Sequence, residues 1–387
     1  MTDDWIYLDF AASTPVDQRV AELMYECRET GFANPASGHV VGRKSAAIIR
    51  NAMAQLEALL NAAPGTLVWT SGATESDNLA IAGGARFRAH RGKHLVTMPT
   101  EHKAVTDVFR ELEKQGFDVT WLEPGENGRL DPDELARALR ADTQLASIMY
   151  VNNETGVMQD IAALGSICRE RDVLFHVDAA QAVGKVPIDL DVLPIDLLSL
   201  TGHKFYGPKG IGALYIANRP GCHVEPILFG GGQQRRIRPG TLPTDLIAGL
   251  GLAAEIAASS IEGDLRHLTS LRERLWAGLR DVDGILVNGD LENGFPGILN
   301  VSVEDVEGES LLLGLDPVCV ATGSACNSKA QEPSYVLRAL GRSDRLAESA
   351  IRFSLGRSTQ KKEVEFAAQR YRETVARLRS LAPKAVA

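Results

Sequence analysis

Short apolar runs alternate along the chain with longer segments in which apolar residues return at helical spacing. The runs predict strands at residues 6–10, 67–70, 93–98, 117–122, 145–151 and 173–177. The spaced segments predict helices at residues 20–27, 45–60, 132–140 and 161–170. Strands that alternate with helices in this way are typical of a mostly parallel, doubly wound α/β sheet.

The pattern changes after residue 249. A helix is predicted from residue 250 onward, followed by strands at 285–287 and 297–303 and a last helix at 362–378. A chain of 387 residues is too long for one core of the usual size, so two domains are expected. We predict a large domain at 16–249 and a smaller α+β domain that combines 1–15 with 250–387.

One stretch joins an apolar run directly to reactive side chains. Residues 195–200 are apolar, and Thr201, a glycine, His203 and Lys204 follow before a turn and a second apolar run at 211–216. Burial at a strand end lowers the pKa of an amine and makes it nucleophilic, as a Schiff-base lysine that holds pyridoxal phosphate requires. The alternative is an ordinary hairpin with a solvated lysine.

Polar side chains also follow the other predicted strands. Residues 71–78 place small and hydroxyl side chains at the start of a helix, where backbone N–H groups bind anions, although a plain helix cap would look the same. Doubly wound sheets bind ligands at the carboxyl ends of their strands. The residues that fall at such ends are Thr74, His102, Asn153, Asp178, Gln181, Thr201, His203 and Lys204.

Composition and charge narrow the functional classes. A net charge of −9 argues against a nucleic-acid binder that works by phosphate neutralisation. No apolar run approaches the roughly 20 residues of a membrane span, and the acidic start of the chain is unlike a signal peptide, so a cytoplasmic protein is expected. Five cysteines without C-x-x-C spacing predict neither a disulfide framework nor a zinc site, and at least one free thiol.

Seven motifs in this order resemble those of the cysteine desulfurases, which are pyridoxal-phosphate enzymes of fold type I in the class-V aminotransferase-like family. The resemblance runs from residue 8 to residue 359. It is carried by residues 71–76, 101–103, 152–156, 176–181, 202–204, 323–338 and 351–357. The loop at 323–338 is similar to the long catalytic loop of the IscS- and NifS-type members.

The resemblance implies roles for the strand-end residues. Lys204 would bind the cofactor covalently and then move the Cα proton of the substrate. Asp178 would pair with the pyridine nitrogen, and His102 would stack on the ring and relay protons. Asn153 and Gln181 would hydrogen-bond the ring oxygen. The phosphate would be held by Ala73, Thr74, Thr201, His203 and, from a second subunit, Thr241.

Thr241 lies in a segment, 230–243, that crosses a dimer interface in the family, so a homodimer is implied. The segment departs from the family pattern at Gln234, Arg236 and Pro239, which leaves the shape of this loop open.

Among the thiols, Cys326 matches the nucleophile of the family, in a run of small polar residues that suits an exposed loop. Cys319 is expected in a buried strand, and Cys27 and Cys168 in amphipathic helices with structural roles. Cys222 is expected in a loop without an evident purpose.

The substrate carboxylate has two candidate partners. The planar fork of an arginine suits bidentate capture of a carboxylate. Arg352 matches the family position for substrate binding, with Asn153 beside it, and Arg357 is the rival.

The implied reaction converts L-cysteine to L-alanine and leaves the sulfur as a persulfide on Cys326. The sulfur would pass to an iron–sulfur scaffold or to tRNA thiolation. No intrinsic metal is expected, although the family leaves open that Cys326 bridges an iron–sulfur cluster shared with a scaffold. The alternatives are a selenocysteine lyase, another pyridoxal-phosphate lyase, or an inactive docking protein with the same fold.

Overall fold

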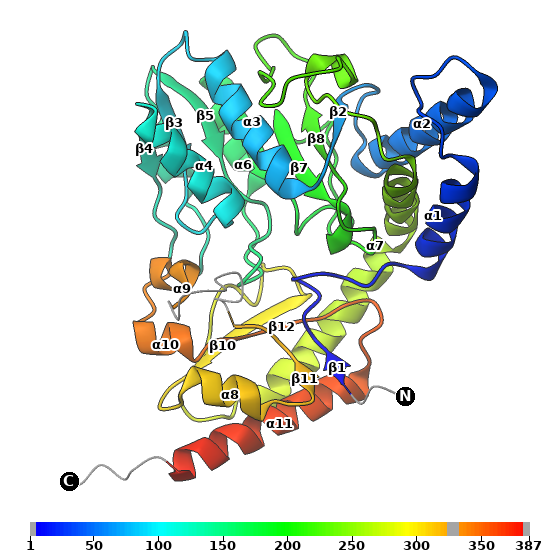
Figure 1. Cartoon of the computed structure of the whole chain (residues 1–387). Coiled ribbons are helices and arrows are strands. Elements are labelled where there is room, and N and C mark those ends of the chain that lie inside the picture. The colour runs from blue at the N-terminus through cyan, green and yellow to red at the C-terminus, as the bar shows by residue number, and fades with distance from the viewer. Residues whose placement is uncertain (1–4, 323–332, 382–387) are drawn as a thin grey trace.

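A seven-stranded sheet forms the core of the larger part of the chain (Figure 1). The computed structural model describes residues 5–322 and 333–381. The strand order is β2-β8-β7-β6-β5-β3-β4, and only β8 runs antiparallel to its neighbours. The mostly parallel α/β sheet predicted from the sequence is therefore confirmed. The strands are β2 (Leu67–Thr70), β3 (His94–Thr97), β4 (Asp118–Trp121), β5 (Thr143–Ser147), β6 (Leu174–Asp178), β7 (Leu197–Thr201) and β8 (Gly212–Ile216).

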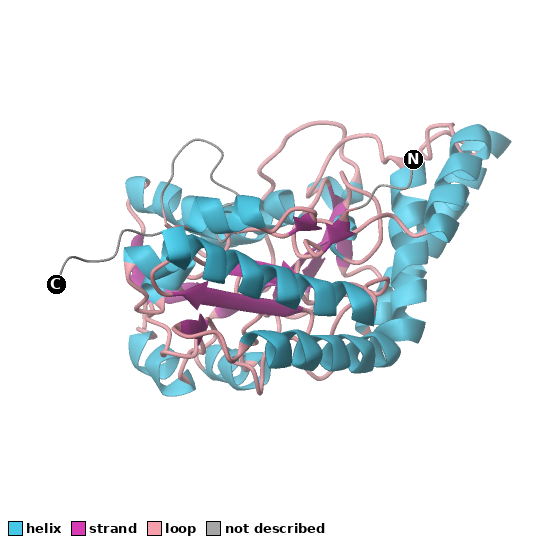
Figure 2. Ribbon diagram, turned by 90° about the horizontal axis from the view of Figure 1, so that it is seen from below, coloured by secondary structure: helices cyan, strands magenta, loops and turns pink. Residues whose placement is uncertain are grey.

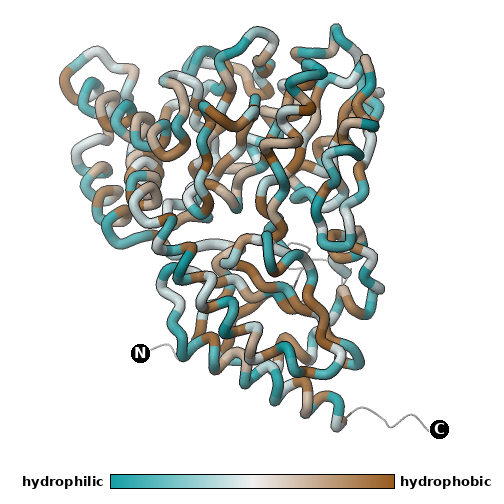
Figure 3. The backbone as a smooth tube through the Cα atoms, turned by 180° about the vertical axis from the view of Figure 1, so that it is seen from behind, coloured by the Kyte–Doolittle hydropathy of each residue, from teal (hydrophilic) through white to brown (hydrophobic). Residues whose placement is uncertain are grey.

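Helices cover both faces of this sheet because successive strand residues point to opposite sides. In β6, Leu174 packs in the cluster under α3 (Ala73–Phe87) and α4 (Lys103–Lys114). Its neighbour Phe175 packs in the main core with α6 (Ile161–Glu170), beside α5 (Pro132–Ala138). Figure 3 shows the hydrophobic stretches concentrated along the inner strands.

A smaller antiparallel sheet, in the order β12-β10-β9, lies below the large sheet in Figure 1 and on the near side in Figure 2, which is seen from below. Its strands are β9 (Ile285–Val287), β10 (Ile298–Val303) and β12 (Ile351–Ser354), and α8 (Gly308–Gly314) packs on α11 (Lys361–Leu381) beside them. Near the N-terminus, β1 (Ile6–Tyr7) pairs in parallel with β11 (Val318–Cys319). The N-terminal segment therefore pairs with a strand of the C-terminal part of the chain.

One long helix connects the two parts. α7 (Thr244–Leu279) packs against α1 (Gln18–Thr30), α2 (Val40–Leu60) and α11. By length and composition, α7 is the one helix among the described residues that could cross a membrane. Its apolar residues do not form an unbroken run, so the sequence did not indicate this. In the fold, 56% of its most apolar window is buried. The predicted domain boundary at 249/250 falls inside α7, so the division into two domains stays a prediction.

Two further predictions need correction. The strand expected at 145–151 is β5, which ends at Ser147, and Ile148, Met149 and Val151 are buried in the loop that follows. Cys319, expected to be buried, is exposed because β11 pairs only with β1 at the edge of the fold. An apolar run reports burial, and it does not separate a strand from a buried loop.

Candidate active site

The polar strand-end residues gather where the two sheets meet. Loops after β2, β3, β5, β6 and β7 all leave the large sheet at the carboxyl ends of their strands. Arg352 of β12 reaches this edge from the smaller sheet, since its Nη1 donates to the Asn153 carbonyl oxygen at 2.9 Å. The geometry matches the ligand position expected for a sheet of this kind.

Lys204 closes the short helix η1 (Gly202–Lys204) that follows β7. Its amine donates to the carbonyl oxygens of Ala11 and Ala12, at 2.6 and 2.9 Å. Both carbonyls belong to the N-terminal segment, which therefore forms one wall of the site. The alternative of a solvated lysine in a plain hairpin does not fit this tertiary contact.

Asp178 ends β6 and is 3% exposed. Burial raises the pKa of this carboxyl, while the hydrogen bond from the Ala180 N–H and the charge of Lys204 act in the opposite direction. Asp77 of α3 is a second buried carboxyl near Asp178. Its pKa is raised by burial and by the charge of Asp178. A buried carboxylate in such a place is stabilised by a cationic partner.

The two histidines of the site are held as neutral rings. His102 caps α4, and its Nδ1 accepts from the Ala104 N–H at 3.1 Å, so the proton of the neutral ring lies on Nε2. Burial lowers the pKa of His102. Burial and the charge of Lys204 lower the pKa of His203 to about 4.

The two amide side chains differ in their partners. Gln181 Nε2 donates to the Ala11 carbonyl oxygen at 2.7 Å, and its Oε1 accepts from Lys185 Nζ at 2.6 Å. The Asn153 Oδ1 atom is buried and has no hydrogen-bond partner within the described part of the chain. Asn153 therefore presents an acceptor that a donor in the site could satisfy.

The N-terminus of α3 lies at the end of β2. Gly72 precedes the helix with φ 149° and supplies no side-chain cap, so Ala73 and Thr74 open the helix without one. A Cβ at Gly72 would lie 3.5 Å from Thr201 Oγ1, which shows how closely the two loops approach. The first turn of a 15-residue helix with no side-chain cap is suited to bind an anion.

Arg352 and Arg357 are held differently. Arg352 is 5% exposed, its Nη2 contacts Asp9 Oδ1 at 2.7 Å, and its buried Nε has no partner among the residues described. Arg357 instead binds Asp264 and Ser260. Only Arg352 contacts the loop that carries Asn153.

Thr241 is exposed and lines a surface hollow with Cys27 and Phe32, apart from the residues above. In the same segment Gln234 bonds the backbone of Trp69 through both amide atoms, at 2.6 and 2.9 Å. Arg238 pairs with Glu75 at 2.7 Å. The unusual residue Gln234 thus fastens the loop to the edge of β2.

Cys326 lies outside the described residues, as does most of its motif. The chain on either side of it is fixed at the site, because Ala321 exchanges backbone hydrogen bonds with Arg352 and Tyr335 Oη donates to the Glu101 carbonyl oxygen. Cys27 and Cys168 are buried in α1 and α6, as expected. Cys222 is partly buried, and burial raises the pKa of its thiol to about 12.

Three residues without a predicted role lie next to predicted site residues in the fold. They are Asp9 beside Arg352, Asp77 near Asp178, and Lys185 beside Gln181. For Lys185, the sequence signal is its spacing of four residues from Gln181, with which it forms a hydrogen bond. Among the described residues no group of three His, Cys, Asp or Glu side chains is placed to hold a metal ion.

Comparison with known proteins gives one consistent match. The model of the aminotransferase class-V family matches residues 6–366. The cysteine desulfurase IscS of Methylococcus capsulatus is 54% identical over 379 residues, which cover 98% of this chain and 94% of that protein. Among solved structures, a NifS-like protein has a TM-score of 0.90 at 33% identity over 97% of this chain and all of that one. SspA in complex with cysteine has a TM-score of 0.82 at 38% identity, over 90% of this chain and 98% of that one.

Proposed function

The chain belongs to the aminotransferase class-V family, and from this premise we infer that it is a cysteine desulfurase, which converts L-cysteine to L-alanine and transfers the sulfur. The observation that carries the proposal is the setting of Lys204. Its amine is held at the end of β7, within electrostatic reach of the buried Asp178 and the neutral His102. A nucleophile, a buried anion and a proton carrier therefore share one site.

The site fits pyridoxal phosphate. The buried carboxyl of Asp178 calls for a cationic partner such as a protonated pyridine, and the unpartnered Oδ1 of Asn153 calls for a donor. The first turn of α3, with Ala73 and Thr74, would hold the phosphate. Thr201, whose Oγ1 approaches Gly72, would bind the same phosphate together with His203. Gln181 would bond the ring oxygen, and Thr241 would complete the phosphate site from a second copy of the chain. When bound, the cofactor stores the electron pair that is released at the substrate Cα.

Lys204 and His102 would divide the proton transfers. The Lys204 amine, when it is not bound to the cofactor, would take the proton from the substrate Cα. His102 carries its proton on Nε2 and accepts at Nδ1 from Ala104, so its ring orientation is fixed. Because its pKa is lowered, the ring is neutral near pH 7 and would donate a hydrogen bond from Nε2, and a proton relay through it would use the imidazolium form.

Arg352 would bind the substrate carboxylate, with Asn153 beside it. Its guanidinium is buried at the boundary of the two sheets, and its Nε has no partner among the described residues. The contact with Asp9 holds the fork in place before substrate arrives. Burial in a site of low dielectric strengthens such a charge-assisted hydrogen bond.

Cys326 would receive the sulfur. Its thiolate attacks the substrate sulfur, so that an S–S bond forms on Cys326, the C–S bond breaks, and the electron pair stays on carbon, where protonation completes alanine. This role is supported by the residues that flank the loop, because Ala321 and Tyr335 both contact elements of the site.

The persulfide would serve a sulfur acceptor, such as an iron–sulfur scaffold or a tRNA-thiolation relay, in the cytoplasm. A homodimer is supported by the exposed position of Thr241 and by the neighbouring Phe229, which is 85% exposed. A second copy would cover such an apolar side chain.

The test is to incubate the protein with L-cysteine and a reductant, and to measure alanine and sulfide while the visible spectrum is recorded. The proposal predicts a cofactor band with equimolar alanine and sulfide. Cys326→Ala should keep the band and release no sulfide, with Cys319→Ala as the matched control that keeps both. Equal sulfide release by Cys326→Ala, with selenocysteine as the better substrate, would support a selenocysteine lyase instead.

A further inference from the structure

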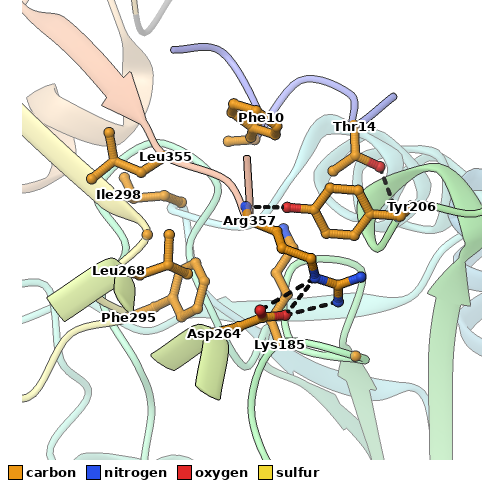
Figure 4. Close-up of a pocket in the computed structure, with 13 residues that line it drawn as sticks. Phe10, Thr14, Lys185, Tyr206, Asp264, Leu268, Phe295, Ile298, Leu355 and Arg357 are labelled. Carbon is orange, nitrogen blue, oxygen red and sulfur yellow. Dashed lines mark hydrogen bonds and ion pairs between the residues drawn. The ribbon is translucent and has the colours of Figure 1, made fainter. Parts of the chain in front are cut away.

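Lys185 is a partly buried lysine that the proposed reaction does not use. It forms part of the wall of a cavity of about 30 Å³, which lies between the N-terminal segment and β10 and is lined mostly by apolar and aromatic residues (Figure 4). Its amine lies 5.7 Å from the centre of the Phe295 ring. The carboxylate in that wall, Asp264, is instead bound to Arg357.

The Lys185 amine forms a hydrogen bond on the side that faces the candidate active site. Nζ donates to Gln181 Oε1 at 2.6 Å, and the same amide donates through Nε2 to the Ala11 carbonyl oxygen at 2.7 Å. Lys204 Nζ donates to that same carbonyl oxygen at 2.6 Å. The contacts form a continuous chain from Lys185 through Gln181 and Ala11 to Lys204.

The chain fixes the orientation of the Gln181 amide at both ends. A carbonyl oxygen can only accept, so the amide nitrogen must face Ala11, and the amide oxygen must then face Lys185. A donor on the amide oxygen polarises the amide and strengthens the hydrogen bond that its nitrogen makes. Gln181 and Lys204 thus share one acceptor.

We propose that Lys185 is a positioning residue for the Lys204 amine, which acts by anchoring the Gln181 amide on the carbonyl that Lys204 also uses. With Gln181 anchored, the Ala11 oxygen is partly satisfied and stabilises a Lys204 ammonium less. Burial lowers the pKa of Lys185, and so do the charges of Lys204 and Arg352, so the two lysines disfavour each other's protonation. The result is a larger fraction of unprotonated, nucleophilic Lys204 near neutral pH.

Other titratable groups near Lys204 also influence how readily its amine is protonated. His102, His203 and Asp178 each interact electrostatically with it, and Arg352 interacts with Lys185. Both histidines are neutral near pH 7, because burial lowers the pKa of each. Among these groups, Asp178 therefore favours the Lys204 ammonium.

The inference rests on the proposed function, and its test is the covalent capture of pyridoxal phosphate by cofactor-free protein. Only the unprotonated Lys204 amine attacks the aldehyde, so the capture rate, followed by absorbance from pH 6 to 10, gives the midpoint of the Lys204 titration. Lys185→Met should raise this midpoint by about 0.5–1 pH unit, roughly a threefold to tenfold change in the acid dissociation constant. Lys185→Arg, which keeps a donor and a charge, and the surface control Lys362→Met should leave it within about 0.2 unit.

A double-mutant comparison tests the route through Gln181. Gln181→Met alone should raise the midpoint of the Lys204 titration, and this variant also tests the inference if Lys185→Met does not fold. When both substitutions are combined, the shift caused by Lys185→Met should fall to half or less of its value in the parent protein. An unchanged midpoint in folded Lys185→Met overturns the inference, and so does a full shift in the Gln181→Met background. Absence of capture by the unmodified protein would instead overturn the proposed function.

Discussion

The two sides of the N-terminal segment differ in how their polar groups are satisfied. On the cavity side, Arg357 binds Asp264, and the Arg357 backbone N–H donates to the Tyr206 hydroxyl, which leaves the cavity with internally paired charges. On the site side, Asp178 is a buried carboxyl and Asn153 Oδ1 has no partner among the described residues. The comparison indicates that the cavity side stabilises the fold, while the site side is arranged for a ligand.

Replacing Lys204 should have the largest effect. Lys204→Ala removes both the nucleophile and the base, and alanine formation should fall by at least ~10³-fold. The melting temperature should change little, because the hydrogen bonds from Lys204 to the Ala11 and Ala12 carbonyl oxygens lie at a partly exposed position. The matched control Lys209→Ala, at an exposed position in the following turn, should keep full activity. Comparable losses in both variants would contradict the assignment.

Asp178→Asn should separate activity from stability. Activity should fall by roughly 10²–10³-fold, because the variant no longer supplies the charge opposite the pyridine nitrogen. Burial raises the folded-state pKa of Asp178 above its unfolded value, so its ionisation destabilises the cofactor-free protein as pH rises. Cofactor-free Asp178→Asn should therefore melt at a higher temperature than the parent at pH 8. A fully active variant would remove Asp178 from the site.

The two arginines test the comparison directly. Arg352→Lys keeps the charge and loses the planar fork, so the KM for L-cysteine should rise by about 10–100-fold. Arg357→Lys should leave this KM unchanged and lower the free energy of unfolding by about 1–2 kcal/mol, because it disrupts the bonds to Asp264. If Arg357→Lys raises KM and Arg352→Lys does not, the two roles are reversed.

Glu154 should give the smallest effect, on stability against pH. Burial raises the pKa of its carboxyl to about 7, well above the unfolded value. The stability that its protonated form provides is therefore lost as pH rises through 7, by roughly 1 kcal/mol between pH 6 and 8. Denaturant unfolding of Glu154→Gln should show a flatter pH dependence over this range. Identical slopes for both proteins would contradict the buried state of Glu154.

Much of the fold could be predicted from the sequence because its apolar runs are short and well separated. β2, α6 and β9 have the bounds that the pattern indicated. The runs did not locate the end of β5, since Ile148 and Val151 are as buried in their loop as they would be in a strand. They also did not indicate that Gln234 would pair with the backbone of Trp69, 165 residues away.

The candidate site was predicted where residues follow strands, and missed where contacts depend on tertiary approach. Asp178 and Lys204 follow β-strand runs directly, so their place was visible in the sequence. Asp9 meets Arg352 across 343 residues, and Lys185 reaches the site only through Gln181 and the Ala11 carbonyl. A backbone carbonyl that joins two side chains leaves no pattern in a sequence.

The central claim is that Lys204 is the lysine that binds the cofactor. The most direct measurement is borohydride reduction of the cofactor-loaded protein, followed by digestion and mass spectrometry of the labelled peptide. The account predicts one pyridoxyl-phosphate adduct per chain, on Lys204. An adduct on Lys185 or Lys209, or no adduct in protein that shows the cofactor band, would contradict it.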